Sequence, residues 1–199
     1  MKLSQWFSTL HKKRVAVALF FLLVSIVLYS LSGDYVSEHI GVVVPDIIVD
    51  HFGPYNLGIV YIWLFIIIIG LFFIFPLVYH PKELPYVMNM FSLFLAVRSG
   101  FVLFTRLQTP PDAIIVHFPK YLQLLNFSND LFFSGHVGVP FLGFLVFKDY
   151  PKLRYFMLAC SIILGIAVLL MHVHYSIDVL SAFFISYGIY HIGNKFIQK

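Results

Sequence analysis

The chain has 199 residues, of which 60% are hydrophobic and only 11% are charged, and its mean hydropathy is +0.91. A soluble domain of this length rarely has such a composition, and several apolar runs are long enough to cross a bilayer. The formal net charge of +4 comes from a few basic residues at the ends of apolar runs, which is typical of topology charges and not of a nucleic-acid-binding surface.

The apolar runs predict an all-α integral membrane protein with one membrane domain over residues 1–199. The first run could serve as a signal peptide, but no small-x-small cleavage site follows it, so we expect a retained helix. Cys160, the one cysteine, lies inside an apolar run and is expected to be a small packing or lipid-facing residue. We expect six transmembrane helices, at residues 15–31, 56–79, 86–106, 131–147, 155–172 and 176–193.

The lysines and arginines predict the orientation of the bundle. With a cytoplasmic N-terminus, the inner side collects the amino-terminal basic cluster, Lys82, the 148–154 turn and the tail, whereas the outer loops hold Lys120 and two arginines near the end of the third helix. We therefore expect a multi-pass protein with both termini in the cytoplasm, and the compact form favours a bacterial inner membrane. The outer segments are then loop 32–55, loop 107–130 and the connection between the fifth and sixth helices.

Ionisable residues gather at this outer level. Inside a membrane such residues are costly, and they usually face the bundle interior or a wet cavity. Several at one depth therefore indicate one cavity. The residues at this level are Arg98, Arg106, Asp130, His136, His174 and Asp178.

Two short motifs carry the predicted chemistry. His174 and Asp178 are four residues apart and share a helix face, so the carboxylate can accept the ring N–H and hold the imidazole in one tautomer. Ser134 and Gly135, which precede His136 at the start of an apolar run, can aim a hydroxyl and backbone N–H groups at an anion. The arginines suit a phosphate, whose oxygens match a guanidinium.

This set of groups predicts phosphoryl transfer through a phosphohistidine. His174 would attack phosphorus with its ring held by Asp178, and His136 would protonate the leaving alkoxide and then deprotonate the acceptor. Because the site faces a lipid leaflet, the phosphate is expected to belong to a phospholipid. A metal site with His172, His174 and Asp178 as ligands is the rival hypothesis. His172 and His174 would point to different sides of one helix and no cysteine joins them, so we expect no metal and no cofactor.

A contact within the fold remains an alternative role for most of these residues. His174 and Asp178 could be a structural hydrogen-bonded pair. For the others, the alternatives are a pair with an acidic loop residue for Arg98, a lipid head-group contact for Arg106, a helix cap for Asp130, a packing role for Ser134, a solvated loop acid for Asp46 and an interfacial aromatic for Tyr175.

The two motifs together resemble the lipid phosphate phosphatase (PAP2) superfamily, and more closely its sphingomyelin synthase branch. In that branch the paired blocks read Gly-Asp-x-Leu-Phe-Ser-Gly-His and His-Tyr-Thr-x-Asp-Val. Residues 129–136 here read Asn-Asp-Leu-Phe-Phe-Ser-Gly-His, and residues 174–179 read His-Tyr-Ser-Ile-Asp-Val. The phosphatases usually carry a Ser-Arg pair before the second histidine, where this chain has Ala167 and Val168, as the synthase branch has apolar residues there.

Further positions support the resemblance, which is strongest over residues 129–187. Arg98, with Thr105, Leu107 and Pro110 after it, is similar to the third-helix motif of the branch, and Val44-Pro45-Asp46 is similar to the Pro-Asp of its first outer loop. The 107–130 loop is shorter than in the animal enzymes and lacks their cysteines. It offers only Asp112 to match an acid that the family often places near its head-group pocket. These departures leave the donor head group and the acceptor open.

The resemblance implies a six-helix bundle of the lipid phosphate phosphatase type that works without a metal and uses His136, His174 and Asp178 in catalysis. It implies transfer of a phospho-head group from a glycerophospholipid to a lipid alcohol such as ceramide, leaving diacylglycerol. The alternatives are a lipid phosphatase or phospholipase C-like hydrolase that uses water, and a non-enzymatic lipid-binding membrane protein. A homo-oligomer stays open, and no nucleic-acid partner is expected. Candidate residues for binding the phosphate or head group are Arg98, Ser134, Gly135, Asp130, Arg106, Asp46 and Tyr175.

Overall fold

The computed structural model describes residues 12–116 and 129–197. Of the basic residues on which the predicted topology rests, Lys2, Lys120 and Lys199 lie outside these residues. Within them the chain forms six α-helices and one π-helical turn, which confirms the prediction of an all-α protein for the described part. The elements are α2 (Lys12–Glu38), the π-turn η1 (Val60–Leu64), α3 (Phe65–Tyr79), α4 (Leu84–Phe104), α5 (Gly135–Val146), α6 (Pro151–Leu170) and α7 (Ser176–Phe196).

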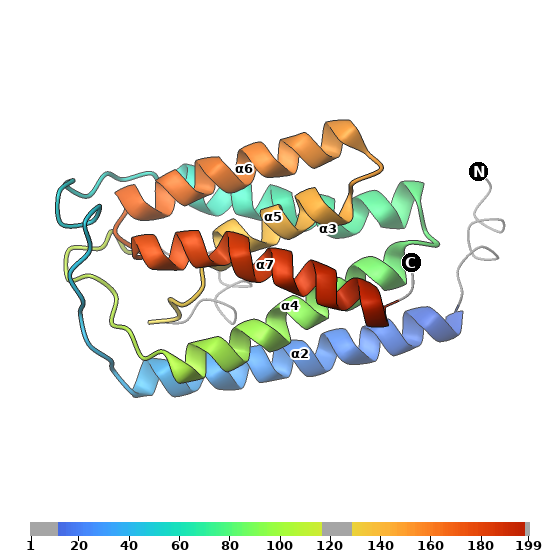
Figure 1. Ribbon diagram of the computed structural model, residues 1–199, viewed down its shortest axis with the longest axis horizontal. Helices are drawn as coiled ribbons and strands as arrows, with labels where there is room; N and C mark the ends of the chain where they lie inside the picture. The colour runs from blue at the N-terminus through green and yellow to red at the C-terminus, as the bar shows by residue number, and fades with distance from the viewer. Residues whose placement is uncertain (1–11, 117–128, 198–199) are drawn as a thin grey trace.

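The helices lie along one long axis, so the connections collect at two opposite ends (Figure 1). One end, at the left of the view, holds the segments after α2, after α4 and between α6 and α7. The other end holds the turns after α3 and after α5, the start of α2 and the end of α7. The described parts of the loops predicted to lie on the outer side therefore share one end of the bundle.

Four of the helical segments are long and apolar enough to cross a membrane: α2, η1 with α3, α4 and α6. By contrast, α5 has 12 residues, which rise about 18 Å. The hydrocarbon core of a bilayer is about 30 Å thick. The described helices therefore support a membrane protein, and a full crossing by all six stays a prediction.

Helix α5 begins at Gly135 and not at residue 131, where its apolar run starts. The residues before it are held in a non-helical segment by polar contacts that the apolar pattern does not reveal, chiefly those of Asp130 with Arg98. Helix α2 differs in the other direction, since it continues past residue 31 to Glu38. Its Ser32 and Gly33 are buried in a helix that contacts α4, because small residues let two helices approach closely.

The packed core lies between the helices, with Phe72 of α3, Phe94 of α4, Leu142 of α5 and Leu164 of α6 all fully buried. At Gly138 the packing leaves no space for a side chain. A Cβ there would lie 2.8 Å from ring atoms of Phe94 and 3.0 Å from Ser186 Oγ. Gly138 therefore lets α4, α5 and α7 meet at one point.

Backbone hydrogen bonds connect the segments at the left end of Figure 1. Val42 pairs with Leu107 in an isolated bridge, and the Gln108 N–H donates to Val42 O at 2.9 Å. The Ile114 N–H donates to Met171 O at 2.9 Å, which joins the segment after α4 to the end of α6. These bonds join the segment after α4 both to the segment after α2 and to the end of α6.

Candidate active site

His174 and Asp178 lie where the α6–α7 connection enters α7. His174 Nδ1 is 3.3 Å from Asp178 Oδ2, and the same oxygen accepts the Tyr175 backbone N–H at 2.9 Å. His174 is 4% exposed and Asp178 is fully buried. The pair is thus within hydrogen-bond distance although His174 precedes the helix, whereas the spacing argument put both residues on one helix face.

The Ser-Gly-His motif joins this pair through the backbone. Ser134 is the residue before α5, and its N–H donates to Asp178 O at 3.1 Å. The Ser134 hydroxyl is fully buried and has no hydrogen-bond partner among the described residues. The backbone hydrogen bond therefore connects the two sequence motifs. The serine hydroxyl lies in the interior, where no described residue forms a hydrogen bond with it.

His136 lies in the first turn of α5 between two aromatic rings. Its ring stacks on Tyr61 at a centroid distance of 4.0 Å and lies at 4.1 Å from the Phe65 ring, tilted by 33°. It also lies within electrostatic range of His174 and Arg98. Tyr61 belongs to the π-helical turn η1, a local widening of a helix that is often found at functional sites. Tyr61 and Phe65 were not predicted as site residues, because nothing in an apolar run marks the residues that face a distant histidine.

Arg98 of α4 holds the non-helical segment before α5. Its Nη1 donates to the Asp130 carboxylate at 2.5 and 2.6 Å, its Nη2 donates to Asp130 O at 3.1 Å, and its Nε donates to Phe133 O at 2.9 Å. Backbone carbonyls at membrane depth need such partners, since no water reaches them. Arg98 thus donates hydrogen bonds to backbone carbonyls that would be bonded to backbone N–H groups if this segment were helical.

Asp130 and Gly135 complete the surroundings of this guanidinium. Asp130 Oδ2 also accepts the Tyr29 hydroxyl of α2 at 2.5 Å, a contact that the sequence analysis did not foresee. A Cβ on Gly135 would lie 3.4 Å from Arg98 Nε, so the glycine keeps the guanidinium next to the α5 N-terminus. Asp130 is not the residue that caps α5, because Ser134 occupies that position.

Asp46, from the segment after α2, contacts the start of α7. Its Oδ2 accepts both the backbone N–H and the hydroxyl of Ser176 at 2.7 Å, and its Oδ1 accepts the Ile48 and Val49 N–H groups. Burial would raise the pKa of Asp46, but the hydrogen bonds from Ser176, Val49 and Ile48 outweigh it and lower the pKa below its ordinary value. This carboxylate therefore joins the segment after α2 to the start of α7.

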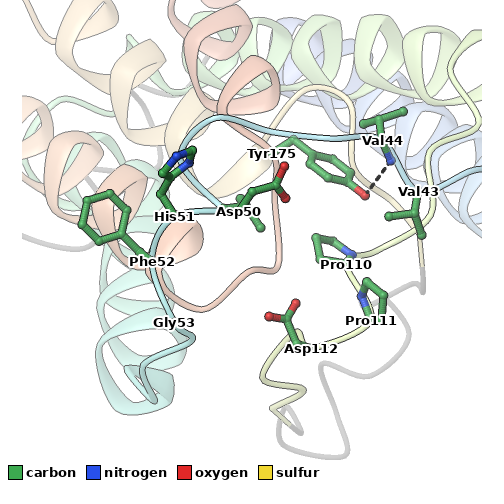
Figure 2. A pocket seen from close by; sticks show the side chains of 11 residues that line it. Val43, Val44, Asp50, His51, Phe52, Gly53, Pro110, Pro111, Asp112 and Tyr175 are labelled. Atoms are coloured by element: carbon green, nitrogen blue, oxygen red, sulfur yellow. Dashed lines mark hydrogen bonds between the residues drawn. The ribbon is translucent and has the colours of Figure 1, made fainter.

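Tyr175 forms hydrogen bonds with the segment after α2 and with the segment after α4. Its hydroxyl donates to Gln108 O at 2.8 Å and accepts the Val44 N–H at 3.4 Å, and the side chain is 1% exposed. Burial raises the pKa of its phenol. Beside it lies a hollow of about 330 Å³, into which the Asp50 and Asp112 carboxylates project (Figure 2). Tyr175 therefore lines this hollow and directly follows His174 in the chain.

The remaining candidates lie apart from the His136–His174 group. His172 is buried in a left-handed backbone conformation (φ 56°) and its Nδ1 is 2.9 Å from Asp112 Oδ2. Across the described residues, no three His, Cys, Asp or Glu side chains are arranged to hold a metal ion. Arg106 follows the end of α4 with an exposed side chain, and its backbone O accepts the Val42 N–H at 3.4 Å.

Residues 128–195 match the model of a known family, described as the PAP2 superfamily C-terminal region. The matched segment contains the Ser-Gly-His motif, His174 and Asp178. No individual curated protein and no solved structure matches the chain. The match covers about a third of the chain, so the similarity to the PAP2 superfamily is shown for this C-terminal region.

Proposed function

We propose that this protein transfers the phospho-head group of a glycerophospholipid to a lipid alcohol through a phosphohistidine on His174. The observation that carries the proposal is the connection of the two motifs. His174 is hydrogen-bonded to a buried carboxylate, and the backbone of that same Asp178 accepts the N–H of Ser134, two residues before His136.

In the first step His174 Nε2 attacks the phosphorus of the donor. With Nδ1–H directed at Asp178, Nε2 carries the lone pair, and the carboxylate stabilises the ring as it becomes positive. The new N–P bond forms as the bond from phosphorus to the glycerol oxygen breaks. His136 gives its proton to that oxygen, and diacylglycerol leaves.

In the second step the hydroxyl of the acceptor gives its proton to His136 and its oxygen bonds to phosphorus. The N–P bond breaks, so both histidines return to their starting states. The arginine and the α5 N-terminus are suited to the negative oxygens of the phosphoryl group, since charge-assisted N–H donors stabilise a developing anion. We assign this role to Arg98, Ser134 and Gly135, with Asp130 holding the guanidinium in place.

We further propose that the site opens to the non-cytoplasmic leaflet of a bacterial inner membrane, with both termini in the cytoplasm. The charge distribution along the sequence supports this orientation. Under this proposal, the segments around Asp46, Arg106 and Tyr175 surround the approach of the lipid head group.

A labelled phospholipid assay tests the proposed reaction. Purified protein should release diacylglycerol when a lipid alcohol such as ceramide is added, and should form the head-group ester of that alcohol. Release with water alone would instead favour a hydrolase, and tight lipid binding without any release would favour a non-enzymatic lipid-binding protein.

His174→Ala should abolish turnover and His136→Ala should reduce it by about 10²- to 10⁴-fold, the usual contribution of a general acid–base residue. His191→Ala is the matched control, because this histidine lies on an exposed part of α7. Turnover of His174→Ala at the wild-type rate would exclude His174 as the nucleophile.

A further inference from the structure

A groove of about 780 Å³ begins at the end of the bundle opposite to the candidate active site and runs along α2 and α4 as far as Leu28 and Ala96. Its walls are α2 and α4, and Phe196 at the end of α7 and Ile197 after it also line the groove. Figure 1 shows that the start of α2, the start of α4 and the end of α7 share this end of the molecule. The volume falls within the range of about 300–1,000 Å³ that is usual for small-molecule sites.

The chemistry of the groove changes along its length. Lys13 and Arg14 stand at its outer end, where the two helices begin. Farther in, the walls are mostly apolar as far as Leu28 and Ala96, with Ser25, Asn89 and Ser92 as the polar lining residues. Arg14 and Leu28 are 14 residues apart on one helix, a rise of about 21 Å. One leaflet contributes about half of a hydrocarbon core of about 30 Å, so the groove is long enough to span one leaflet.

Asn89 lies between the basic end and the apolar part, one turn inside α4. Its Oδ1 is buried and accepts no hydrogen bond from the described residues. A buried amide oxygen without a donor is costly, and in hydrocarbon the cost is not relieved by water. The neighbouring hydroxyls of Ser25 and Ser92 donate to carbonyls of their own helices and do not serve it. The groove therefore contains an acceptor that no described residue satisfies.

We propose that this groove binds one anionic phospholipid from the leaflet at the end of the bundle away from His136 and His174. The phosphate lies between Lys13 and Arg14, a hydroxyl of the head group donates to Asn89 Oδ1, and one acyl chain lies along α2 and α4. The order cation, hydrogen-bond acceptor, apolar wall matches the order phosphate, glycerol, chain in such a lipid. This inference does not depend on the proposed reaction.

Native mass spectrometry of the full chain, with phosphatidylglycerol and phosphatidylcholine of identical chains, tests the site. The wild-type protein should retain one phosphatidylglycerol in preference to phosphatidylcholine. Lys13→Ala/Arg14→Ala should weaken that retention roughly thirtyfold, given the usual contribution of two basic residues near an anionic lipid surface. The matched control is Lys148→Ala/Lys152→Ala, which removes the same charge from exposed positions at the same end and should leave retention unchanged.

Ala96→Phe gives a second test that leaves the charge unchanged. The added ring fills the apolar part of the groove and should also release the lipid, while thermal unfolding reports that the variant remains folded. Three results would overturn the proposal: equal retention of the two phospholipids by the wild type, equal loss in the basic variant and its control, or a dimer that the groove variants dissociate, since a second copy would then be the occupant.

Discussion

At the scale of single residues, Asp178 connects the two motifs of the candidate site. Its Oδ2 faces the His174 ring, its backbone O accepts the Ser134 N–H, and its Oδ1 has no hydrogen-bond partner among the described residues. The four-residue spacing was enough to predict the contact between His174 and Asp178. The contact with Ser134 could not be predicted in that way, because it depends on how α5 and α7 pack.

Asp178→Asn should lower kcat by about 10⁴-fold and leave KM almost unchanged, the size of effect found when the carboxylate that orients a catalytic histidine becomes an amide. An amide can present its N–H to the ring and favour the tautomer with the proton on Nε2, which removes the nucleophilic lone pair. Steady-state kinetics with the labelled phospholipid measure both constants. A change in KM alone would assign Asp178 to substrate binding and not to the orientation of His174.

The structure places three aromatic residues in contact with the candidate site that the apolar pattern does not distinguish from their neighbours. Tyr29, Tyr61 and Phe65 lie inside predicted spans, where aromatic side chains usually face lipid or pack in the core. Their contacts with Asp130 and His136 join residues that are far apart in sequence. Without an account of which helix faces meet, no local pattern distinguishes them from the other aromatic residues of the same runs.

At the scale of helices, composition located all six segments, and the errors fall at their ends. The start of α5 is displaced because Arg98 supplies the hydrogen bonds of the segment before it, and α2 is longer because its small residues are buried in a helix that packs on α4. Hydropathy reports the average environment of a window and contains no information on such contacts. The π-turn at Val60–Leu64 was likewise absent from the prediction, since its residues resemble those of an ordinary apolar helix.

The crossing of α4, α5 and α7 should be sensitive to a single methyl group. Gly138→Ala places a Cβ 2.8 Å from the Phe94 ring, and overpacking of this kind typically costs about 1–3 kcal/mol. Thermal unfolding in detergent should show a lower Tm than that of the wild type. Gly188→Ala in α7 is the control, because a Cβ there meets no atom within 4 Å. It should be neutral or slightly stabilising, as alanine favours a helix over glycine. Equal effects of the two variants would contradict the tight packing at Gly138.

At the scale of the whole molecule, Asp46 joins the segment after α2 to α7. Asp46→Asn should lower the stability of the folded state by about 0.5–2 kcal/mol at neutral pH, the usual cost of losing a helix cap. Hydrogen bonds lower the pKa of Asp46 in the folded state, so its contribution is complete above the unfolded value of about 3.9. It is lost as the pH falls through the lower, folded value.

Tm measured from pH 7 down to pH 3 checks the linkage. The difference in Tm between the wild type and Asp46→Asn should narrow as the solution becomes acidic. Protonation removes the negative charge of Asp46 in the wild type, and the variant already lacks that charge. Asp34→Asn, on an exposed part of α2, should follow the wild type throughout. A gap that stays constant over this range would show that the charge of Asp46 does not hold the helix start.

The bonds from Ser134 to Asp178 and from Asp46 to Ser176 also bear on how the protein is made. Synthesis proceeds from the N-terminus, so helices α2 to α6 leave the ribosome before the partners of Asp46 and Ser134 exist. A nascent chain that stops before residue 174 lacks the proposed nucleophile and the acceptor that anchors the start of α5. Products of interrupted translation are thus expected to be inert toward the lipids around them, and activity should emerge only when the last helix has been inserted.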